Sequence, residues 1–111
     1  MAYHLCSELV SVAWDETGGF GNLEEIGEWT AVLLLEDPVP TGARIVIQCK
    51  EHQLNGYVET CNYEDPLGFF VSVRLDPDCR WSADWFSPQH LLTFPAQLST
   101  KAFALPIASG Y

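Results

Sequence analysis

The chain has 111 residues, of which 48% are hydrophobic and 18% charged, a composition typical of one folded domain with an ordinary core. Fifteen acidic and five basic residues give a formal net charge of −10, which argues against nucleic-acid or anionic-membrane partners because few cations can replace counterions on phosphates. No stretch reaches the ~18 apolar residues of a membrane span, and the first residues carry Glu8 and no basic n-region, so we expect a soluble, cytoplasmic protein.

Acidic residues are concentrated in the first part of the chain, since residues 1–43 contain no Lys or Arg. The eight acidic residues of this part are Glu8, Asp15, Glu16, Glu24, Glu25, Glu28, Glu36 and Asp37. One interpretation is a solvated surface that keeps the protein soluble and monomeric. The other is that this part cannot bind a phosphate ligand, or that it meets a basic partner.

Four cysteines, Cys6, Cys49, Cys61 and Cys79, are scattered along the chain without a C-x-x-C pair. Because no secretory signal is present, we expect reduced thiols that mostly pack as small core residues. Cys49 and His52 have a C-x-x-H spacing, with Cys61 nearby in sequence. A tetrahedral zinc site needs four converging ligands, whereas Cys49 belongs to the core face of a strand and His52 to a turn, so we expect no metal site.

The first three predicted strands are separated by turns. Leu5–Trp14 changes the phase of its apolar residues part-way, which predicts a bulge near Glu8–Val10. Thr17-Gly18-Gly19 is expected to separate this strand from the second. Thr30–Glu36 is apolar on both faces, which predicts a central strand covered on each side.

The middle of the chain alternates between apolar and polar residues with a period of two, which predicts half-buried strands. In the first such strand Ala43, Ile45, Ile47 and Cys49 share the core face, and in the last one Phe69, Val71, Val73 and Leu75 do. Leu54–Tyr63 is a further strand between them. Turns are predicted at Asp37–Gly42, Glu64–Gly68 and Asp76–Asp78. Six short strands at this spacing are typical of a small barrel or sandwich.

After Asp78 the pattern changes. Ser82 and Ser87-Pro88 are typical of helix starts, so Ser87–Leu92 is predicted as a short helix or turn. Its apolar side chains, together with Phe86, would plug one end of the barrel. We therefore expect a barrel domain over residues 1–94 and a C-terminal tail over residues 95–111 that is part helical.

Aromatic residues form two groups in the sequence. Trp81 and Trp85 are four residues apart, which predicts one helical face lying on the barrel. Trp14, Phe20 and Trp29 surround the first hairpin, where they would either close the mouth of the barrel or form an exposed patch for a protein partner.

Three stretches of the sequence resemble a PilZ domain, and the similarity spans residues 7–94. They are residues 38–45 (PVPTGARI), Gly56-Tyr57-Val58 through Gly68–Val73, and Cys79-Arg80-Trp81-Ser82 to Pro88–Leu92. The resemblance implies a bacterial, all-β protein with a six-stranded antiparallel β-barrel and a short C-terminal helical segment. It also implies a connection with cyclic diguanylate signalling.

In PilZ domains two motifs bind cyclic diguanylate, and this chain departs from both. The Arg-x-x-x-Arg motif is absent, because no arginine precedes Arg44. The (Asp/Asn)-x-Ser-x-x-Gly motif aligns with residues 25–30, where Glu25, Gly27 and Thr30 stand at the three defined positions. Trp29 adds bulk where a ligand would have to approach. We therefore expect a degenerate site that binds neither cyclic diguanylate nor another cofactor.

Two hypotheses about function follow. The first is a non-enzymatic regulatory or adaptor module, a monomer or weak homodimer, that acts through contact with a protein partner; no catalytic motif is found. The alternative is a sensor whose barrel binds cyclic diguanylate or another small molecule in a non-standard way. In that case Glu25, Glu28 and Trp29 would face a cationic or a neutral aromatic ligand.

Overall fold

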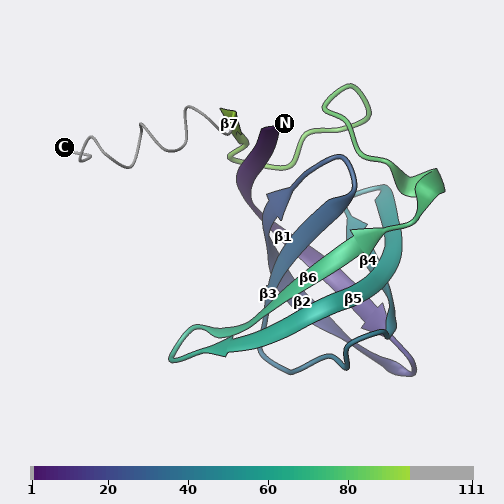
Figure 1. Ribbon diagram of the computed structural model, residues 1–111, viewed down its shortest axis with the longest axis vertical. Helices are drawn as coiled ribbons and strands as arrows, with labels where there is room; N and C mark the ends of the chain where they lie inside the picture. The colour runs from purple at the N-terminus through teal and green to yellow at the C-terminus, as the bar shows by residue number, and fades with distance from the viewer. Residues whose placement is uncertain (1, 96–111) are drawn as a thin grey trace.

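The computed structural model describes residues 2–95, which form seven β-strands and one short 3-10 helix. The elements are β1 (Ala2–Trp14), β2 (Thr17–Ile26), β3 (Thr30–Leu35), β4 (Arg44–Cys49), β5 (His52–Glu64), β6 (Gly68–Leu75), η1 (Pro77–Cys79) and β7 (Leu92–Pro95). Strands pair in the order β2-β3-β6-β5-β4-β1, and β1 also pairs with β2, which closes the barrel (Figure 1). The predicted all-β, six-stranded antiparallel barrel is confirmed.

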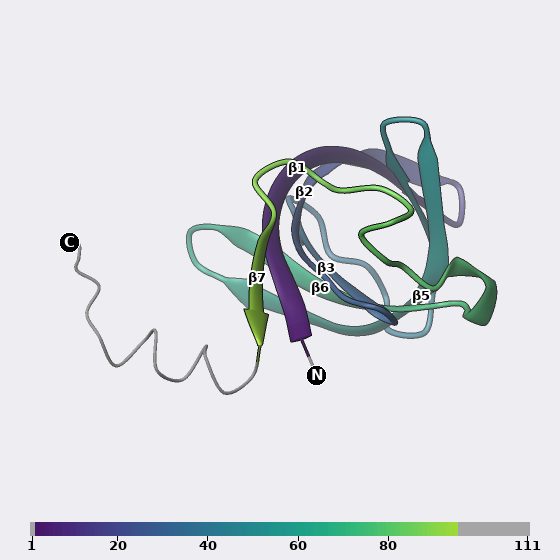
Figure 2. The same ribbon diagram turned by 90° about the horizontal axis from the view of Figure 1, so that it is seen from above.

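Consecutive strands of the barrel run in opposite directions, because every pair in the sheet is antiparallel. The β1–β2, β3–β4 and β5–β6 connections therefore lie at one end, which we call the turn end, at the bottom of Figure 1. The β2–β3 and β4–β5 connections lie at the opposite end. There the cover segment, residues 76–91, crosses the mouth of the barrel, as Figure 2 shows. We call this the covered end.

The core fills the barrel with the inward-facing residues of all six strands. In β4 the buried residues are Ile45, Ile47 and Cys49, and the β6 pattern is also as predicted. In β3 the prediction of cover on both faces is wrong, since Val32 and Leu34 are only half-buried. The inner face of β3 contacts the core, whereas the outer face is not fully covered by the residues that the structure describes.

The first hairpin differs from the prediction in where it turns. Trp14 pairs with Thr17, so Asp15 and Glu16 form a two-residue turn and Thr17–Gly19 belongs to β2 rather than to a connection. Asp15 has φ +51°, a left-handed conformation that Asp tolerates better than most residues. The predicted bulge in β1 is present, but it lies slightly earlier, between Leu5 and Glu8.

Of the two alternatives for Ser87–Leu92, the short helix is wrong and the turn is confirmed, at residues 89–90. Besides η1, the cover segment contains only turns, at residues 83–85 and 89–90, and is followed by β7, which pairs with the start of β1. A few of its backbone hydrogen bonds are local, such as the one from the Trp85 N–H to the Ser82 carbonyl at 3.0 Å, and others reach the barrel: the Trp81 N–H donates to the Glu28 carbonyl at 3.0 Å, and the Ser7 N–H donates to the Gln89 carbonyl at 3.0 Å. Phe86 plugs the barrel as predicted, whereas Leu92 is 58% exposed. The helical piece expected over Ala96–Leu105 lies outside the described residues.

Candidate functional site

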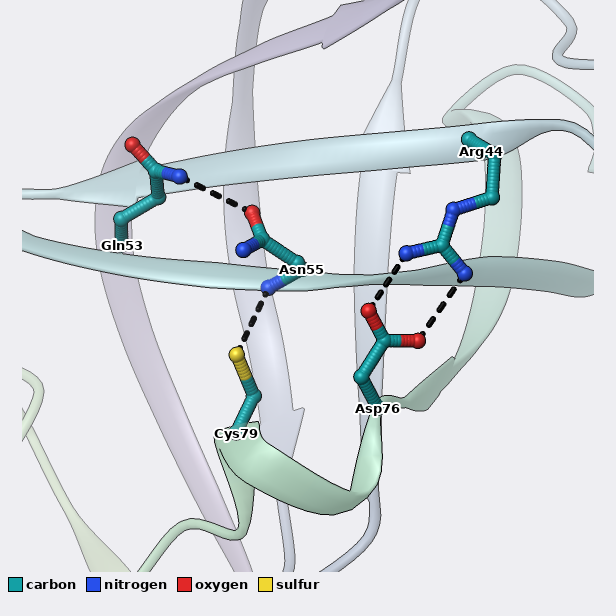
Figure 3. Close-up of polar contacts among 5 residues, drawn as sticks. All are labelled: Arg44, Gln53, Asn55, Asp76 and Cys79. Carbon is teal, nitrogen blue, oxygen red and sulfur yellow. Dashed lines mark hydrogen bonds and ion pairs between the residues drawn. The ribbon is translucent and has the colours of Figure 1, made fainter.

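The start of the cover segment is fastened to β4 and β5 by polar contacts, shown in Figure 3. The Arg44 guanidinium donates two hydrogen bonds to the Asp76 carboxylate, one of them at 2.9 Å, and holds the pKa of that carboxyl below its usual range. The Asp76 N–H donates to the Asn55 carbonyl at 2.9 Å, and the Asn55 N–H donates to Cys79 Sγ at 3.4 Å. These contacts fix where the segment enters the mouth of the barrel.

Aromatic side chains close the same end. Trp81 is buried, and its Nε1–H donates to the Phe86 carbonyl at 3.0 Å. The Phe86 ring stacks on His52, with centroids 4.6 Å apart and planes 7° from parallel, and Trp85 packs edge-on against both rings. The single helical face predicted for the two tryptophans is absent, since Trp81 is 3% and Trp85 39% exposed. The His4 ring packs edge-on against Trp81, with ring centroids 5.0 Å apart. Aromatic side chains of the chain itself therefore fill the mouth of the barrel.

The residues aligned with the degenerate motif lie at the covered end, where β2 ends, turns and continues as β3. Glu25 is half-buried, and desolvation raises the pKa of its carboxyl. The Gly27 N–H donates to the Thr30 carbonyl at 2.8 Å, which closes the turn. The Trp29 carbonyl accepts from the Leu75 N–H at 2.8 Å. These backbone groups of the turn are therefore hydrogen-bonded within the chain.

Arg80 of the cover segment contacts the two side chains between Gly27 and Thr30. Its guanidinium pairs with the Glu28 carboxylate and lies 5.7 Å from the centroid of the Trp29 ring. A guanidinium over an indole face is a favourable cation–π arrangement. The cation that Glu28 and Trp29 face is thus one that the chain itself provides.

All four basic residues in the described part of the chain have carboxylate partners. Besides Arg80 with Glu28, the pairs are Arg44 with Asp76, Lys50 with Glu8 (3.8 Å), and Arg74 with Glu59 (3.6 Å). A dinucleotide with two phosphates would have to break one of these pairs to gain a cationic contact.

The three aromatic residues expected around the first hairpin do not lie together. Trp14 is 8% exposed and belongs to the core, whereas Phe20 is 71% exposed on the outer face of β2. Trp29 lies beyond the far end of β2, at the covered end. The expectation of one aromatic group is therefore wrong, because side chains of alternate strand residues point to opposite faces and β2 is ten residues long.

Phe20 instead belongs to an apolar patch that no motif indicated. Leu9, Phe20 and Leu67 are 69%, 71% and 63% exposed, and with Leu34 and Leu35 they line an open depression of about 340 Å³. They come from β1, β2, β3 and the turn of the β5–β6 hairpin, which projects beyond the barrel in Figure 1. We call Leu9, Phe20 and Leu67, together with the half-buried Leu34, the apolar patch; Leu35 belongs to the core beneath it.

Acidic residues lie at all three connections of the turn end, and two of these connections, β3–β4 and β5–β6, flank the apolar patch. Each of the three connections at this end carries two adjacent exposed carboxylates: Asp15-Glu16, Glu36-Asp37 and Glu64-Asp65. Glu36 also lines the depression. The sequence reveals the acidic residues, but only the strand directions bring these three pairs to one end.

Other chemistry is not indicated by the described residues. Residues 2–95 contain no group of three or more His, Cys, Asp or Glu side chains placed to hold a metal ion. All four cysteines are free. His52 pairs with Cys49 across the β4–β5 turn, but its ring packs on Phe86. Among the same residues, no helix is long and apolar enough to cross a membrane. No known family model, curated protein or solved structure matches this chain.

Proposed function

We propose that this chain is a non-enzymatic regulatory adaptor with a PilZ-like barrel, which acts by contact with another protein and does not bind cyclic diguanylate. The observation that carries the proposal is the apolar patch, with three large side chains more than 60% exposed beside one another around a depression. Contiguous apolar surface of this kind marks interaction sites on soluble domains. Its centre is apolar and its surroundings are charged, as in protein–protein interfaces.

The covered end supports the second part of the proposal. The resemblance places a ligand at the turn between β2 and β3, and there Arg80 already occupies Glu28 and Trp29. Glu25 adds a carboxylate that is partly desolvated, so a phosphate brought near it would be repelled more strongly than in water. Loss of the ligand from this end is compatible with a barrel that keeps only its role as a scaffold.

A second candidate is a small-molecule sensor, favoured by the contact between Arg80 and the pair formed by Glu28 and Trp29. A carboxylate beside an indole face binds cations, so an external guanidinium or ammonium compound would compete with Arg80. Such a ligand would have to displace a group that is covalently part of the chain. The adaptor function requires no displacement and is the one we propose.

Calorimetric titration of cyclic diguanylate into the full chain, at low and moderate salt, tests the proposal. We expect no saturable heat at ~100 μM ligand, against a clear signal from a PilZ domain with both motifs intact as positive control. The Arg80→Ala variant, which frees Glu28 and Trp29, should also give no heat with the dinucleotide. Its matched control is Arg44→Ala, which removes an ion pair of the same type at the start of the cover segment and leaves Arg80 on Glu28 and Trp29. Saturable binding to the wild-type chain would refute the proposal.

Titration of arginine and of tetramethylammonium separates the two candidates. The adaptor function predicts no binding of either cation to the wild-type chain. Binding that appears with Arg80→Ala and not with Arg44→Ala would mean that the pair of Glu28 and Trp29 recognises cations only when its own arginine is absent. Binding to the wild-type chain would favour the sensor.

A further inference from the structure

We propose that the apolar patch, together with the two acidic turns that flank it, is a docking site for a basic amphipathic segment of a partner protein. The inference rests on the proposed adaptor function and adds the place of contact and the chemistry of the partner. Apolar side chains of the segment would enter the depression, while its Lys or Arg side chains would meet the carboxylates of the turn end.

The shape of the patch suits side chains rather than a whole small molecule. Its volume of about 340 Å³ is near the lower limit of the ~300–1,000 Å³ of ligand pockets, and it is open to solvent. Leu9, Phe20 and Leu67 project around it, so an entering side chain would be contacted from several strands. A few large apolar residues packed into such a hollow commonly provide most of an interface's binding free energy.

The negative charge of the turn end favours a partner segment with basic residues. The three acidic pairs at the turn end comprise Asp15, Glu16, Glu36, Asp37, Glu64 and Asp65, all exposed. The described basic residues are paired with other carboxylates, namely Asp76, Glu8, Glu59 and Glu28, so they do not neutralise this end. A basic segment would gain from the field that these six carboxylates produce, and it would associate faster at low salt.

The same charges disfavour a second copy of the chain as the occupant. In a symmetric dimer built on this patch, the carboxylates that flank it in one copy would lie near those of the other, namely Glu36, Asp37, Glu64 and Asp65. Each copy also carries a formal charge of −10. Like charges placed opposite one another disfavour an interface, so a basic partner fits better than self-association.

Site-specific photo-crosslinking in an extract of the native cells tests where partners bind. A photoreactive amino acid replaces Phe20 in one variant of the full chain, and Trp85 or Tyr57 in two controls. Both control residues are 39% exposed and lie outside the patch. We expect crosslinks from position 20 to peptides rich in Lys or Arg and in large apolar residues. Crosslinks only from positions 57 or 85 would overturn this inference and leave the adaptor function standing. Absence of protein crosslinks from all three positions would contradict both.

The crosslinked segment, made as a synthetic peptide, then tests the chemistry. The variant with Phe20→Ser and Leu67→Ser should bind it at least ~10-fold more weakly than wild type, and Trp85→Ser should change binding less than ~2-fold. A triple variant at the turn end, with Glu36→Gln, Asp37→Asn and Glu64→Gln, should lose about 5- to 10-fold.

The matched charge control is the triple variant Glu51→Gln, Asp78→Asn and Asp84→Asn, which changes net charge equally with exposed residues of the covered end. We expect this control to retain wild-type affinity within ~2-fold at moderate salt. Equal losses from the two triple variants would indicate only general attraction to an acidic protein, and would overturn the inference. A peptide that is acidic or uncharged, or a dimer that Phe20→Ser dissociates in sedimentation, would overturn it as well.

Discussion

Glu8 is the buried carboxylate that connects the cover segment to the barrel, and its replacement tests how the covered end is held. The side chain is 7% exposed, and its Oε1 accepts a hydrogen bond from the Gln89 N–H at 2.8 Å. The bulge before Glu8 interrupts the β1–β2 ladder, and the Ser7 N–H is used instead for the Gln89 carbonyl. Gln89 is therefore bonded to β1 through both its backbone groups. Lys50 Nζ lies 3.8 Å from the same Glu8 oxygen.

Glu8→Ala should destabilise the fold by about 2 kcal/mol. A hydrogen bond to a charged group contributes about 1.5–3 kcal/mol, and the exposed position of Gln89 allows water to replace part of that contribution. The ion pair with Lys50 adds less than about 1 kcal/mol, because Lys50 is half exposed. For a domain of this size the loss corresponds to a decrease in Tm of roughly 8–16 °C.

Glu8→Gln is the matched variant, because an amide oxygen can still accept the Gln89 N–H bond while the charge is removed. We expect it to lose only about 0.5–1 kcal/mol, the contribution of the ion pair. Urea denaturation gives the free energies of unfolding, and amide hydrogen exchange at Gln89 reports the local bond. If both variants lost the same stability, the charge and not the hydrogen bond would hold the segment, and the reasoning would be refuted.

Three further predictions concern the barrel itself. Gly56→Ala should destabilise the fold by at least about 2 kcal/mol, because a Cβ at this position would lie 2.2 Å from the Arg74 carbonyl oxygen. In the control Gly19→Ala, the Cβ would have no atom within 4 Å, and stability should change by less than about 1 kcal/mol. Comparable denaturation midpoints for the two variants would contradict this prediction. Glu25→Gln should stabilise the protein at neutral pH but not below pH 4. The native state binds the Glu25 proton more tightly than the unfolded chain does, so stability decreases as pH rises above the usual pKa of 4.5, and a stability difference independent of pH would contradict the assigned desolvation. In the folded protein a thiol reagent at pH 8 should modify the half-buried Cys61 before the three buried cysteines. Burial raises the pKa of the Cys6 thiol to about 12, so this thiol should react slowly. Rapid modification of Cys6 would contradict the prediction and would show that β1 opens.

Period-two alternation made the barrel strands predictable, because each strand has one face in the core. Ile45 and Ile47 in β4, and Val71 and Val73 in β6, are buried as expected. The turn at Asp15 was not predictable in the same way, since Thr17-Gly18-Gly19 is the stronger local turn pattern and only cross-strand pairing places it inside β2. Local propensity competes with tertiary pairing there, and pairing determines the result.

The cover segment departs from its expected helical structure for a related reason. Ser82 and Ser87-Pro88 have the local chemistry of helix starts, and a turn does begin at Ser82, but Trp81 and Gln89 on either side bond to Glu28 and Ser7 of the barrel. The apolar patch could not be predicted because Leu9 and Leu67 are far apart in sequence and each is an ordinary exposed residue alone. Their approach depends on the register of β1, β2 and β3 and on the position of the β5–β6 hairpin, which the sequence of any one strand does not contain.

The two ends of the barrel use their charged groups in different ways, and this difference explains why we place the interaction at the turn end. At the covered end the Arg80–Glu28 and Arg44–Asp76 pairs hold residues 76–91 across the mouth, and Lys50 pairs with Glu8 of β1. Their contribution is internal, so a ligand there would compete with folding contacts. At the turn end, three pairs of carboxylates are exposed, and two of the pairs, Glu36-Asp37 and Glu64-Asp65, flank the apolar patch. Exposed like charges raise the free energy of the isolated domain, and a basic partner that covers them would lower it. A binding site at this end therefore opposes no contact that the fold requires.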